Sequence, residues 1–212
     1  FKHVSLTYDD SNITALNDVS FTIKDGTTLG IFGKTGSGKS TIANLVCRLY
    51  DTTKGDITFG NTNIKDLNLF GLRSCIGYIP QDGYLFSGSV KENIGFASNI
   101  IDEKEILAAA KKAEILEEID RFTDGLQTII GERGVKLSGG QRQRLAIART
   151  FYKKPTLFIF DDCLSAIDAT KEHKILKNLH LKKKGKTSII ISHRIATIKD
   201  ADHIIVLEEG KI

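Results

Sequence analysis

Short runs of hydrophobic residues alternate along this chain with patterns typical of amphipathic helices. The runs rich in β-branched or aromatic residues predict strands at residues 19–23, 28–32, 75–79, 156–160, 187–191 and 203–207. The last four runs are almost continuously hydrophobic, which is typical of strands buried on both faces of a sheet. A helical pattern at residues 40–50 follows the second run. This alternation predicts an α/β fold.

The pattern changes in the middle of the chain. Between about residues 82 and 154 longer helical periodicities dominate, for example at 102–112 and 141–152. We therefore expect a helical lobe, residues 82–153, to be inserted into a sheet lobe made of residues 1–81 and 154–212.

A glycine-rich loop lies between the predicted strand 28–32 and the predicted helix 40–50. Its sequence fits the pattern Gly-x4-Gly-Lys-Ser/Thr of loops that bind phosphate groups. The residues expected to contact a bound nucleotide are Gly33, Lys34, Thr35, Gly36, Ser37, Gly38, Lys39, Ser40 and Thr41. Glycines let backbone N–H groups point at phosphate oxygens, while Lys39 and the helix N-terminus add positive potential. The Ser40 hydroxyl is expected to bind Mg²⁺, so the loop predicts a site for ATP and magnesium.

An aspartate follows the predicted strand 156–160. A phosphate-binding loop needs an acidic residue that orients the magnesium ion, usually at the end of a buried strand, and Asp161 has that position. The alternative is that Asp161 only caps the next turn. The phosphate-binding loop upstream favours the metal-binding role.

A second anion-binding pattern precedes the predicted helix 141–152. Ser138, Gly139, Gly140 and Gln141 form a small, glycine-rich segment directly before that helix. Because the loop at residues 33–40 already serves this chain's own nucleotide, the simplest use of the second segment is to contact a nucleotide bound by another copy. The alternative is an ordinary helix cap.

Composition and charge narrow the class of protein. Charged residues make up 26% of the 212 residues and hydrophobic residues 41%, as in a soluble globular domain. The formal net charge is only +4 and no long block of Lys or Arg occurs, so nucleic acid is not expected as a partner. The short run of lysines at 182–184 is interpreted as a solvated helix end.

Cysteine spacing and hydropathy further restrict the class of protein. Cys47, Cys75 and Cys163 are far apart and lack Cys-x-x-Cys spacing, so neither a disulfide framework nor a zinc site is expected. The sequence contains no hydrophobic stretch near the ~20 residues that span a bilayer. The chain starts at Phe1 and stops at Ile212, and we expect it to be a domain of a longer protein.

In their order along the chain these segments resemble the motifs of the ATP-binding domain of ATP-binding-cassette (ABC) proteins. The resemblance covers essentially the whole chain. It implies an ATPase core with a phosphate-binding loop, a mainly parallel sheet, an antiparallel β edge and an inserted helical lobe. It also implies hydrolysis of ATP with Mg²⁺ by a head-to-tail dimer, in which each nucleotide lies between the loop of one copy and the Ser138 segment of the other.

The resemblance assigns roles to four further residues. Tyr8 corresponds to the aromatic residue that stacks on adenine, although a tyrosine here can also be a core or edge-strand residue. Gln81 corresponds to a glutamine that reaches the magnesium ion and the attacking water, with a plain loop amide as the alternative. His193 corresponds to the histidine that contacts the γ-phosphate, and Asp168 to an aspartate at the interface between two copies.

Two segments resemble exporters in particular. Residues 131–134, Gly-Glu-Arg-Gly, look like the segment that exporters use against their transmembrane domains, and residues 82–94 have a similar character. The implied partners are a transmembrane domain of the same or another chain and a second ATP-binding domain. The implied location is the cytoplasmic face of the cell membrane. A soluble ABC ATPase of DNA repair or translation is the rival, but it predicts coiled-coil insertions or tandem cassettes.

The sequence departs from the family pattern at Asp162. The usual residue is a glutamate that acts as general base, and aspartate is shorter by one methylene group. Such a substitution resembles the degenerate half of a heterodimeric multidrug-type exporter, so we expect a weakly hydrolytic site and favour a heterodimer over a homodimer. The alternative is a non-hydrolytic, ATP-gated regulatory half. Because His193 is retained, the site is not expected to be inactive.

Overall fold

The computed structural model describes residues 1–9, 11–98, 100–131, 135–180 and 186–212. The chain forms two compact units. The sheet unit contains Phe1–Tyr78, Thr156–Asp162 and Gly185–Ile212, and the helical unit contains Ile79–Pro155 and Cys163–Lys184. The expected lobes differ from these units mainly in residues 163–184, because helix α7 in that segment contacts helix α4 of the helical unit. The lysine run at 182–184 lies outside the described residues.

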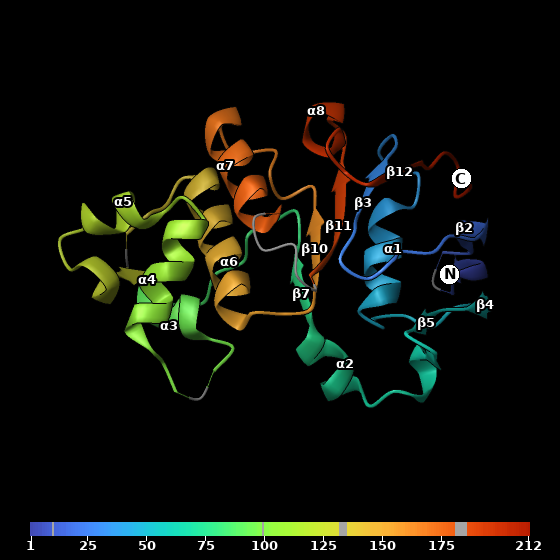
Figure 1. Ribbon diagram of the computed structural model, residues 1–212, viewed down its shortest axis with the longest axis horizontal. Coiled ribbons are helices and arrows are strands. Elements are labelled where there is room, and N and C mark those ends of the chain that lie inside the picture. The colour runs from blue at the N-terminus through green and yellow to red at the C-terminus, as the bar shows by residue number, and fades with distance from the viewer. Residues whose placement is uncertain (10, 99, 132–134, 181–185) are drawn as a thin grey trace. The chain divides into compact units, whose positions relative to one another are not determined.

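A five-stranded sheet forms the centre of the sheet unit (Figure 1). Its order is β12 (His203–Val206), β3 (Thr28–Phe32), β11 (Thr187–Ser192), β10 (Leu157–Asp161) and β7 (Ile76–Ile79). The pairs β12–β3, β3–β11 and β11–β10 are parallel. Every residue of β10 is buried, which explains its continuous hydrophobic sequence. The predicted strands at 28–32, 75–79, 156–160, 187–191 and 203–207 are thus confirmed to within one residue at each end.

Antiparallel strands complete the sheet unit. β1 (Lys2–Tyr8) lies between β2 (Ile13–Val19) and β4 (Lys54–Asp56), and β5 (Thr58–Phe59) pairs with β6 (Thr62–Asn63). The predicted fold class, a mainly parallel sheet with an antiparallel β edge and helices, is confirmed. The predicted strand at 19–23 is wrong, since β2 ends at Val19. Phe21 and Ile23 pack on the hydrophobic core from an irregular segment, in which the backbone of Phe21 exchanges two hydrogen bonds with Phe1 but no continuous strand forms.

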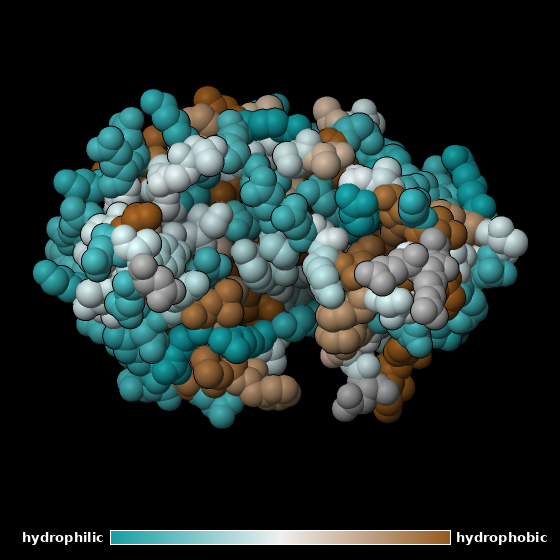
Figure 2. Space-filling view, turned by 180° about the vertical axis from the view of Figure 1, so that it is seen from behind, coloured by the Kyte–Doolittle hydropathy of each residue, from teal (hydrophilic) through white to brown (hydrophobic). Residues whose placement is uncertain are grey.

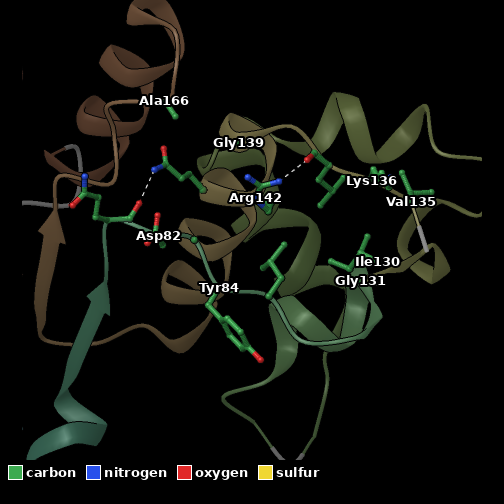
Figure 3. A pocket seen from close by; sticks show the side chains of 14 residues that line it. Asp82, Tyr84, Ile130, Gly131, Val135, Lys136, Gly139, Arg142 and Ala166 are labelled. Atoms are coloured by element: carbon green, nitrogen blue, oxygen red, sulfur yellow. Dashed lines mark hydrogen bonds between the residues drawn. The ribbon is translucent and has the colours of Figure 1, made fainter. Parts of the chain in front are cut away.

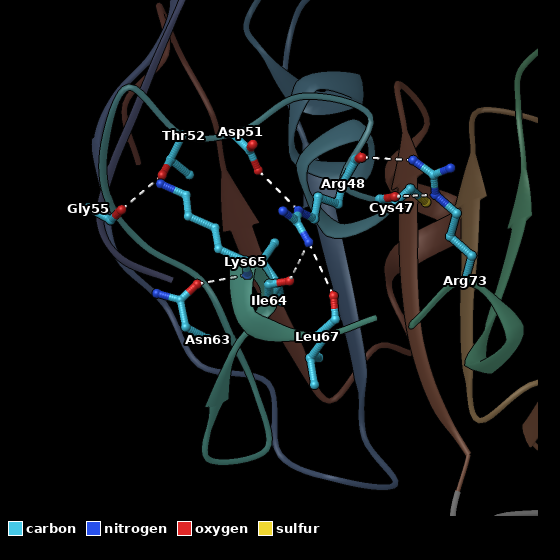
Figure 4. Close-up of polar contacts among 10 residues, drawn as sticks. All are labelled: Cys47, Arg48, Asp51, Thr52, Gly55, Asn63, Ile64, Lys65, Leu67 and Arg73. Carbon is cyan, nitrogen blue, oxygen red and sulfur yellow. Dashed lines mark hydrogen bonds and ion pairs between the residues drawn. The ribbon is translucent and has the colours of Figure 1, made fainter. Parts of the chain in front are cut away.

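Helix α1 (Lys39–Val46) follows the glycine-rich loop and ends earlier than the predicted 40–50. Two arginines explain its end (Figure 4). Arg48 adopts a left-handed backbone, with φ of 49°, and its Nη1 donates to the carbonyl oxygens of Ile64 and Leu67, each at 3.2 Å. Arg73 on α2 (Leu69–Cys75) donates to the carbonyl oxygens of Cys47 at 3.1 Å and Arg48 at 2.9 Å. Arg73 thus bonds carbonyl groups that the end of α1 leaves unpaired, while Arg48 ties the turn after the helix to residues 64 and 67.

The helical unit is built around α6 (Gly139–Lys153), which contacts α3 (Val90–Gly95) and α4 (Glu103–Lys112) (Figure 1). Its other elements are α5 (Leu116–Asp120), α7 (Ala169–His180) and the short strands β8 (Gly88–Ser89) and β9 (Ile129–Ile130). Ser89, Asp102 and Ser138 cap α3, α4 and α6 with side-chain hydrogen bonds. Among the described residues, no helix is both long and hydrophobic enough to cross a membrane.

Candidate nucleotide-binding site

The glycine-rich loop connects β3 to α1 and has room only for glycine at its end. Gly38 is the N-cap residue of α1, with φ of 99°, a conformation that other residues rarely adopt. A Cβ atom at Gly38 would also collide with the carbonyl oxygen of Ala15. Glycine at this position therefore lets the loop pass close to Ala15 where α1 begins, while residues 34–36 of the loop are exposed.

The start of α1 is suited to an anion. The helix has no side-chain cap and no acidic residue in its first turn, so its first N–H groups and its dipole lack a negative partner from this helix. Lys39 is only 6% exposed, and its Nζ donates to the carbonyl oxygen of Lys34 at 2.6 Å. Burial lowers the pKa of Lys39, while the charges of Asp162 and Asp161 act in the opposite direction. Among the described residues, the buried Ser37 Oγ has no hydrogen-bond partner. Phosphate oxygens would satisfy these groups.

Asp161 lies at the carboxyl end of β10 and is joined to the loop. Ser40 Oγ donates to its Oδ1 at 2.9 Å, and the Tyr78 hydroxyl donates to its Oδ2 at 3.1 Å. Burial raises the pKa of Asp161, and the hydrogen bonds from Ser40 and Tyr78 oppose that shift. A hydroxyl and a carboxylate side by side are the hard oxygen ligands that Mg²⁺ prefers, so Ser40 and Asp161 fit the ion. When bound, the ion would supply positive charge next to the phosphates.

Tyr78 was not predicted as a site residue. It lies within the predicted strand 75–79, and its ring packs on the hydrophobic core of the sheet unit. Because a buried tyrosine usually has a polar partner for its hydroxyl, a tyrosine in a core strand could have indicated such a contact. The sequence did not indicate that this partner is Asp161.

Asp162 and His193 lie next to each other beside the loop. The Nε2 atom of His193 is 3.7 Å from Asp162 Oδ2, and its Nδ1 is 3.1 Å from the carbonyl oxygen of Gly33. A carbonyl oxygen can only accept, so Nδ1 is the donor in the contact with Gly33. Asp162 adopts a left-handed backbone, with φ of 48°, held by its N–H bond to the Ile191 carbonyl oxygen. The structure thus brings together the loop, the residues after β10 and the histidine after β11.

Tyr8 lies beside the first turn of α1. Its hydroxyl is 3.1 Å from Thr41 Oγ1, and its ring meets the ring of Tyr50 edge-on at a centroid distance of 5.0 Å. Tyr50 was not predicted as a site residue, because its ring contact with Tyr8 depends on the turn that follows α1. The two rings form an aromatic surface within the sheet unit next to the glycine-rich loop.

If Tyr8 stacks on a base, its replacement should change nucleotide affinity. We expect Tyr8→Ala to weaken ATP binding by about tenfold and Tyr8→Trp to preserve it, since stacking on an aromatic ring contributes about 1–3 kcal/mol per base. Calorimetry measures both constants. Tyr84→Ala, which removes an exposed tyrosine of the helical unit, is the control. Equal affinity in all variants would make Tyr8 a purely structural residue.

The predicted second anion-binding segment starts α6 in the helical unit. Ser138 Oγ accepts from the Gln141 N–H at 3.3 Å, and Gln141 Oε1 accepts from the Ser138 N–H at 2.9 Å. These reciprocal bonds form a capping box, so the segment is at least a helix cap, the alternative interpretation above. The first turn of α6 contains no acidic residue, and Gly139 and Gly140 leave its N-terminus without bulky side chains.

Gln81 and Asp168 also belong to the helical unit. The exposed Gln81 lines a cavity of about 790 Å³, shown in Figure 3, and its carbonyl oxygen accepts from Gln143 Nε2 at 2.9 Å. Asp168 starts α7, where its Oδ1 accepts from the Lys171 N–H at 2.9 Å. That hydrogen bond holds the pKa of Asp168 below its ordinary value. The exporter-like segment 131–134 is described only at Gly131, and its other residues lie outside the described part of the chain.

A buried lysine on an uncapped helix N-terminus, with a serine–aspartate pair beside it, defines a nucleoside-triphosphate-binding domain. A family profile described as "ABC transporter" matches residues 16–165. The chain belongs to the ABC transporter family. It is an ATP-binding domain of the exporter type, and domains of this class are ATPases.

Individual relatives cover the whole chain. It is 45% identical to the "Probable multidrug resistance ABC transporter ATP-binding/permease protein YheI" of Bacillus subtilis, over 100% of this chain and 36% of the relative. It is 44% identical to an "ATP-dependent lipid A-core flippase" of Pasteurella multocida, over 100% of this chain and 37% of the relative. The structure of a bacterial Atm1-family ABC exporter with ATP bound matches with a TM-score of 0.95 and 39% identity, over 100% of this chain and 37% of that one. The chain thus spans about a third of the length of these relatives.

Proposed function

We propose that this chain binds and hydrolyses ATP as the motor domain of a membrane exporter. It would act at the cytoplasmic face of the cell membrane, as a head-to-tail dimer with a second ATP-binding domain. The observation that carries the proposal is the convergence of the buried Lys39, the Ser40–Asp161 pair and His193 around one loop. ATP binding would close the dimer and hydrolysis would reopen it, which can drive alternating access in attached membrane segments.

Residues of the sheet unit are proposed to have different roles in binding and hydrolysing the nucleotide. The first N–H groups of α1 and Lys39 would bind the phosphates, and Ser40 and Asp161 would hold Mg²⁺. Tyr8 would stack on the adenine ring. The carboxylate of Asp162 would accept a proton from the attacking water, while His193 would contact the γ-phosphate. From the helical unit, the side chain of Gln81 is proposed to reach the metal ion and the attacking water, the role that the family resemblance gives it.

The site of this chain is proposed to be weakly hydrolytic. Asp162 carries the charge of a general base on a side chain one methylene shorter than glutamate, and its Oδ2 lies 3.7 Å from His193. A carboxylate that is misplaced by about 1 Å can already cost about 10²-fold in rate. This favours a heterodimer in which the partner domain carries glutamate. A non-hydrolytic regulatory half is the second candidate, and the same aspartate supports it.

An aromatic cluster in the helical unit supports the proposal of a transmembrane partner. Phe86 and Phe96 stack at a centroid distance of 4.1 Å, and Tyr84 meets Phe86 edge-on at 5.2 Å. Arg149 Cζ lies 5.1 Å from the Phe86 centroid, and Nη1 donates to the Tyr84 carbonyl oxygen at 3.0 Å, so a partly buried cation holds the cluster. Tyr84 is 67% exposed and Phe96 61%. Figure 2 shows groups of hydrophobic side chains set among hydrophilic ones on one face of the molecule. Tyr84 and Phe86 lie in the exporter-like segment 82–94, and this cluster is our proposed docking surface.

Replacing Lys39 tests the proposed function. We expect Lys39→Ala to weaken ATP binding or turnover at least tenfold, about 1.4 kcal/mol, because the variant loses a buried charge against the β- and γ-phosphates. Calorimetry measures binding, and phosphate release measures turnover. The matched control is Lys24→Ala, which removes an exposed lysine of the same unit. Unchanged binding and turnover in Lys39→Ala would contradict the assignment of residues 33–40.

A further inference from the structure

One carboxylate in the helical unit joins three helices. Glu118 on α5 accepts two hydrogen bonds at the same oxygen, Oε1, from Arg144 Nη2 at 2.6 Å and from Lys171 Nζ at 2.7 Å. Arg144 belongs to α6, and Lys171 belongs to the first turn of α7. The side chains are largely buried, with 17% of Glu118, 6% of Arg144 and 33% of Lys171 exposed. Helices distant in the sequence therefore meet at a single charged group.

These buried ionic contacts are expected to contribute little to the stability of the fold. Burying ions has a desolvation cost, and hydrophobic replacements of buried ion pairs are often neutral or stabilising. Here one carboxylate serves two cations, and within the described chain the buried Nε of Arg144 has no hydrogen-bond partner. Burial alone would raise the pKa of Glu118, but the hydrogen bond from Lys171 and the charge of Arg144 hold it below its ordinary value. The group is therefore charged near neutral pH, and what it provides is directional contact between helices.

The two helices that Glu118 joins carry two segments assigned above to the dimer interface. Helix α6 is capped by Ser138, and Arg144 follows within the same helix. The backbone N–H of Lys171 bonds to Asp168 Oδ1, while its side chain bonds to Glu118. Lys171 thus links the carboxylate of Glu118 directly to Asp168.

A backbone contact joins the same two segments at a second point. A Cβ atom added to Gly140 would lie 2.8 Å from the carbonyl oxygen of Ala166, which is two residues before Asp168. Figure 3 shows Ala166 close to Gly139 at the start of α6. With a contact at Gly140 and an ionic contact at Glu118, the start of α6 and the start of α7 are fixed against each other.

We propose that Glu118 is a positioning residue that holds the Ser138 segment and Asp168 in one arrangement, so that both meet the nucleotide site of a second copy together. The inference rests on the proposed head-to-tail dimer. Glu118 belongs to the helical unit, whereas the residues proposed to bind this chain's own phosphates belong to the sheet unit, and it acts through Arg144 and Lys171. Its loss should therefore weaken dimer closure and turnover, while ATP binding by the sheet unit is retained.

The test compares Glu118→Gln with Glu117→Gln in the full chain. Glu117 is an exposed neighbour on the same helix, so the second variant controls for loss of a negative charge. We expect Glu118→Gln to weaken ATP-driven dimerisation by about fivefold or more, as for other residues that couple two segments. Sedimentation velocity with ATP measures dimerisation, and calorimetry measures the ATP affinity of the monomer, which should not change. Glu117→Gln should change neither.

A double-mutant cycle with Lys171→Gln separates positioning from stability. If the two residues act in one network, the double variant should dimerise about as well as each single variant. Additive losses, or a lower melting temperature with unchanged dimerisation, would overturn the inference. If Glu118→Gln does not fold, Lys171→Gln alone applies the same criterion, because it retains the Glu118–Arg144 pair. A wild-type chain that binds ATP but dimerises neither with itself nor with a second ATP-binding domain that carries glutamate would overturn the proposed function as well, whereas normal dimerisation of Glu118→Gln would overturn the inference alone.

Discussion

Replacing Asp162 with glutamate is expected to raise steady-state phosphate release at least tenfold. A positioned general base typically contributes 10²–10⁴-fold in rate, about 3–5 kcal/mol. Aspartate withdraws the carboxylate by roughly 1.5 Å, and misplacement by about 1 Å can cost about 10²-fold. The rest of the site favours recovery, since Lys39 is buried at the loop and His193 bonds to the Gly33 carbonyl oxygen.

The measurement is phosphate release by the wild-type chain and Asp162→Glu, with ATP-driven dimerisation checked in each. The matched control is Asp162→Asn, which keeps the length of the side chain and removes its charge, and it should release phosphate no faster than wild type. Brisk wild-type turnover that Asp162→Glu leaves unaltered would contradict the weakly hydrolytic site and favour a homodimer in which aspartate suffices. Turnover that stays absent in Asp162→Glu, despite dimerisation, would favour the regulatory alternative.

Ser138→Arg is expected to abolish ATP-driven dimers while the monomer keeps nearly its full affinity for ATP. The large cation would occupy the N-terminus of α6, where we propose that the γ-phosphate of the opposite copy binds. Size-exclusion chromatography with and without nucleotide measures the dimer. Loss of ATP binding by the folded monomer would mean that the segment acts within its own chain.

Two further variants separate anion binding from helix capping at the same position. Ser138→Asp keeps a good N-cap acceptor for the Gln141 N–H but brings a negative charge. Ser138→Thr keeps both the cap and a neutral hydroxyl. If the segment binds a phosphate, Asp should abolish dimerisation and Thr should preserve it. If it is only a cap, both variants should dimerise normally.

Strands β3, β10 and β11 could be predicted because they are almost entirely buried and are therefore almost continuously hydrophobic. The expectation of burial on both faces is wrong for the edge strand β12, in which Ile204 is 46% and Val206 57% exposed. The predictions of the strand at 19–23 and of the end of α1 were wrong because hydrophobic spacing alone does not determine where a strand or helix ends. Phe21 and Ile23 have the spacing of a strand but pack from an irregular segment. The end of α1 depends on Arg73, which contacts Cys47 and Arg48 only after the chain has folded.

The glycine-rich loop and Asp161 could be found because their chemistry follows from the local sequence. The missed residues act through partners far along the chain. Tyr78 bonds to Asp161, and Glu118 bonds to Lys171, across separations of 83 and 53 residues. No periodicity or spacing in one sequence indicates such pairs. The same limit applies to Tyr50, whose contact with Tyr8 requires the left-handed turn at Arg48.

The order of strands in the sheet determines when this chain can fold during synthesis. Strand β3 is complete at Phe32, but both of its neighbours, β11 and β12, are made from residues 187–206. Until those residues leave the ribosome, a hydrophobic strand has two open edges that can pair with other chains. Helices α3–α6 come from one continuous stretch and can form first, because their contacts are local. The sheet unit should therefore fold after these helices, and substitutions in β11 and β12 should reduce the yield of soluble protein even where they lie far from the nucleotide.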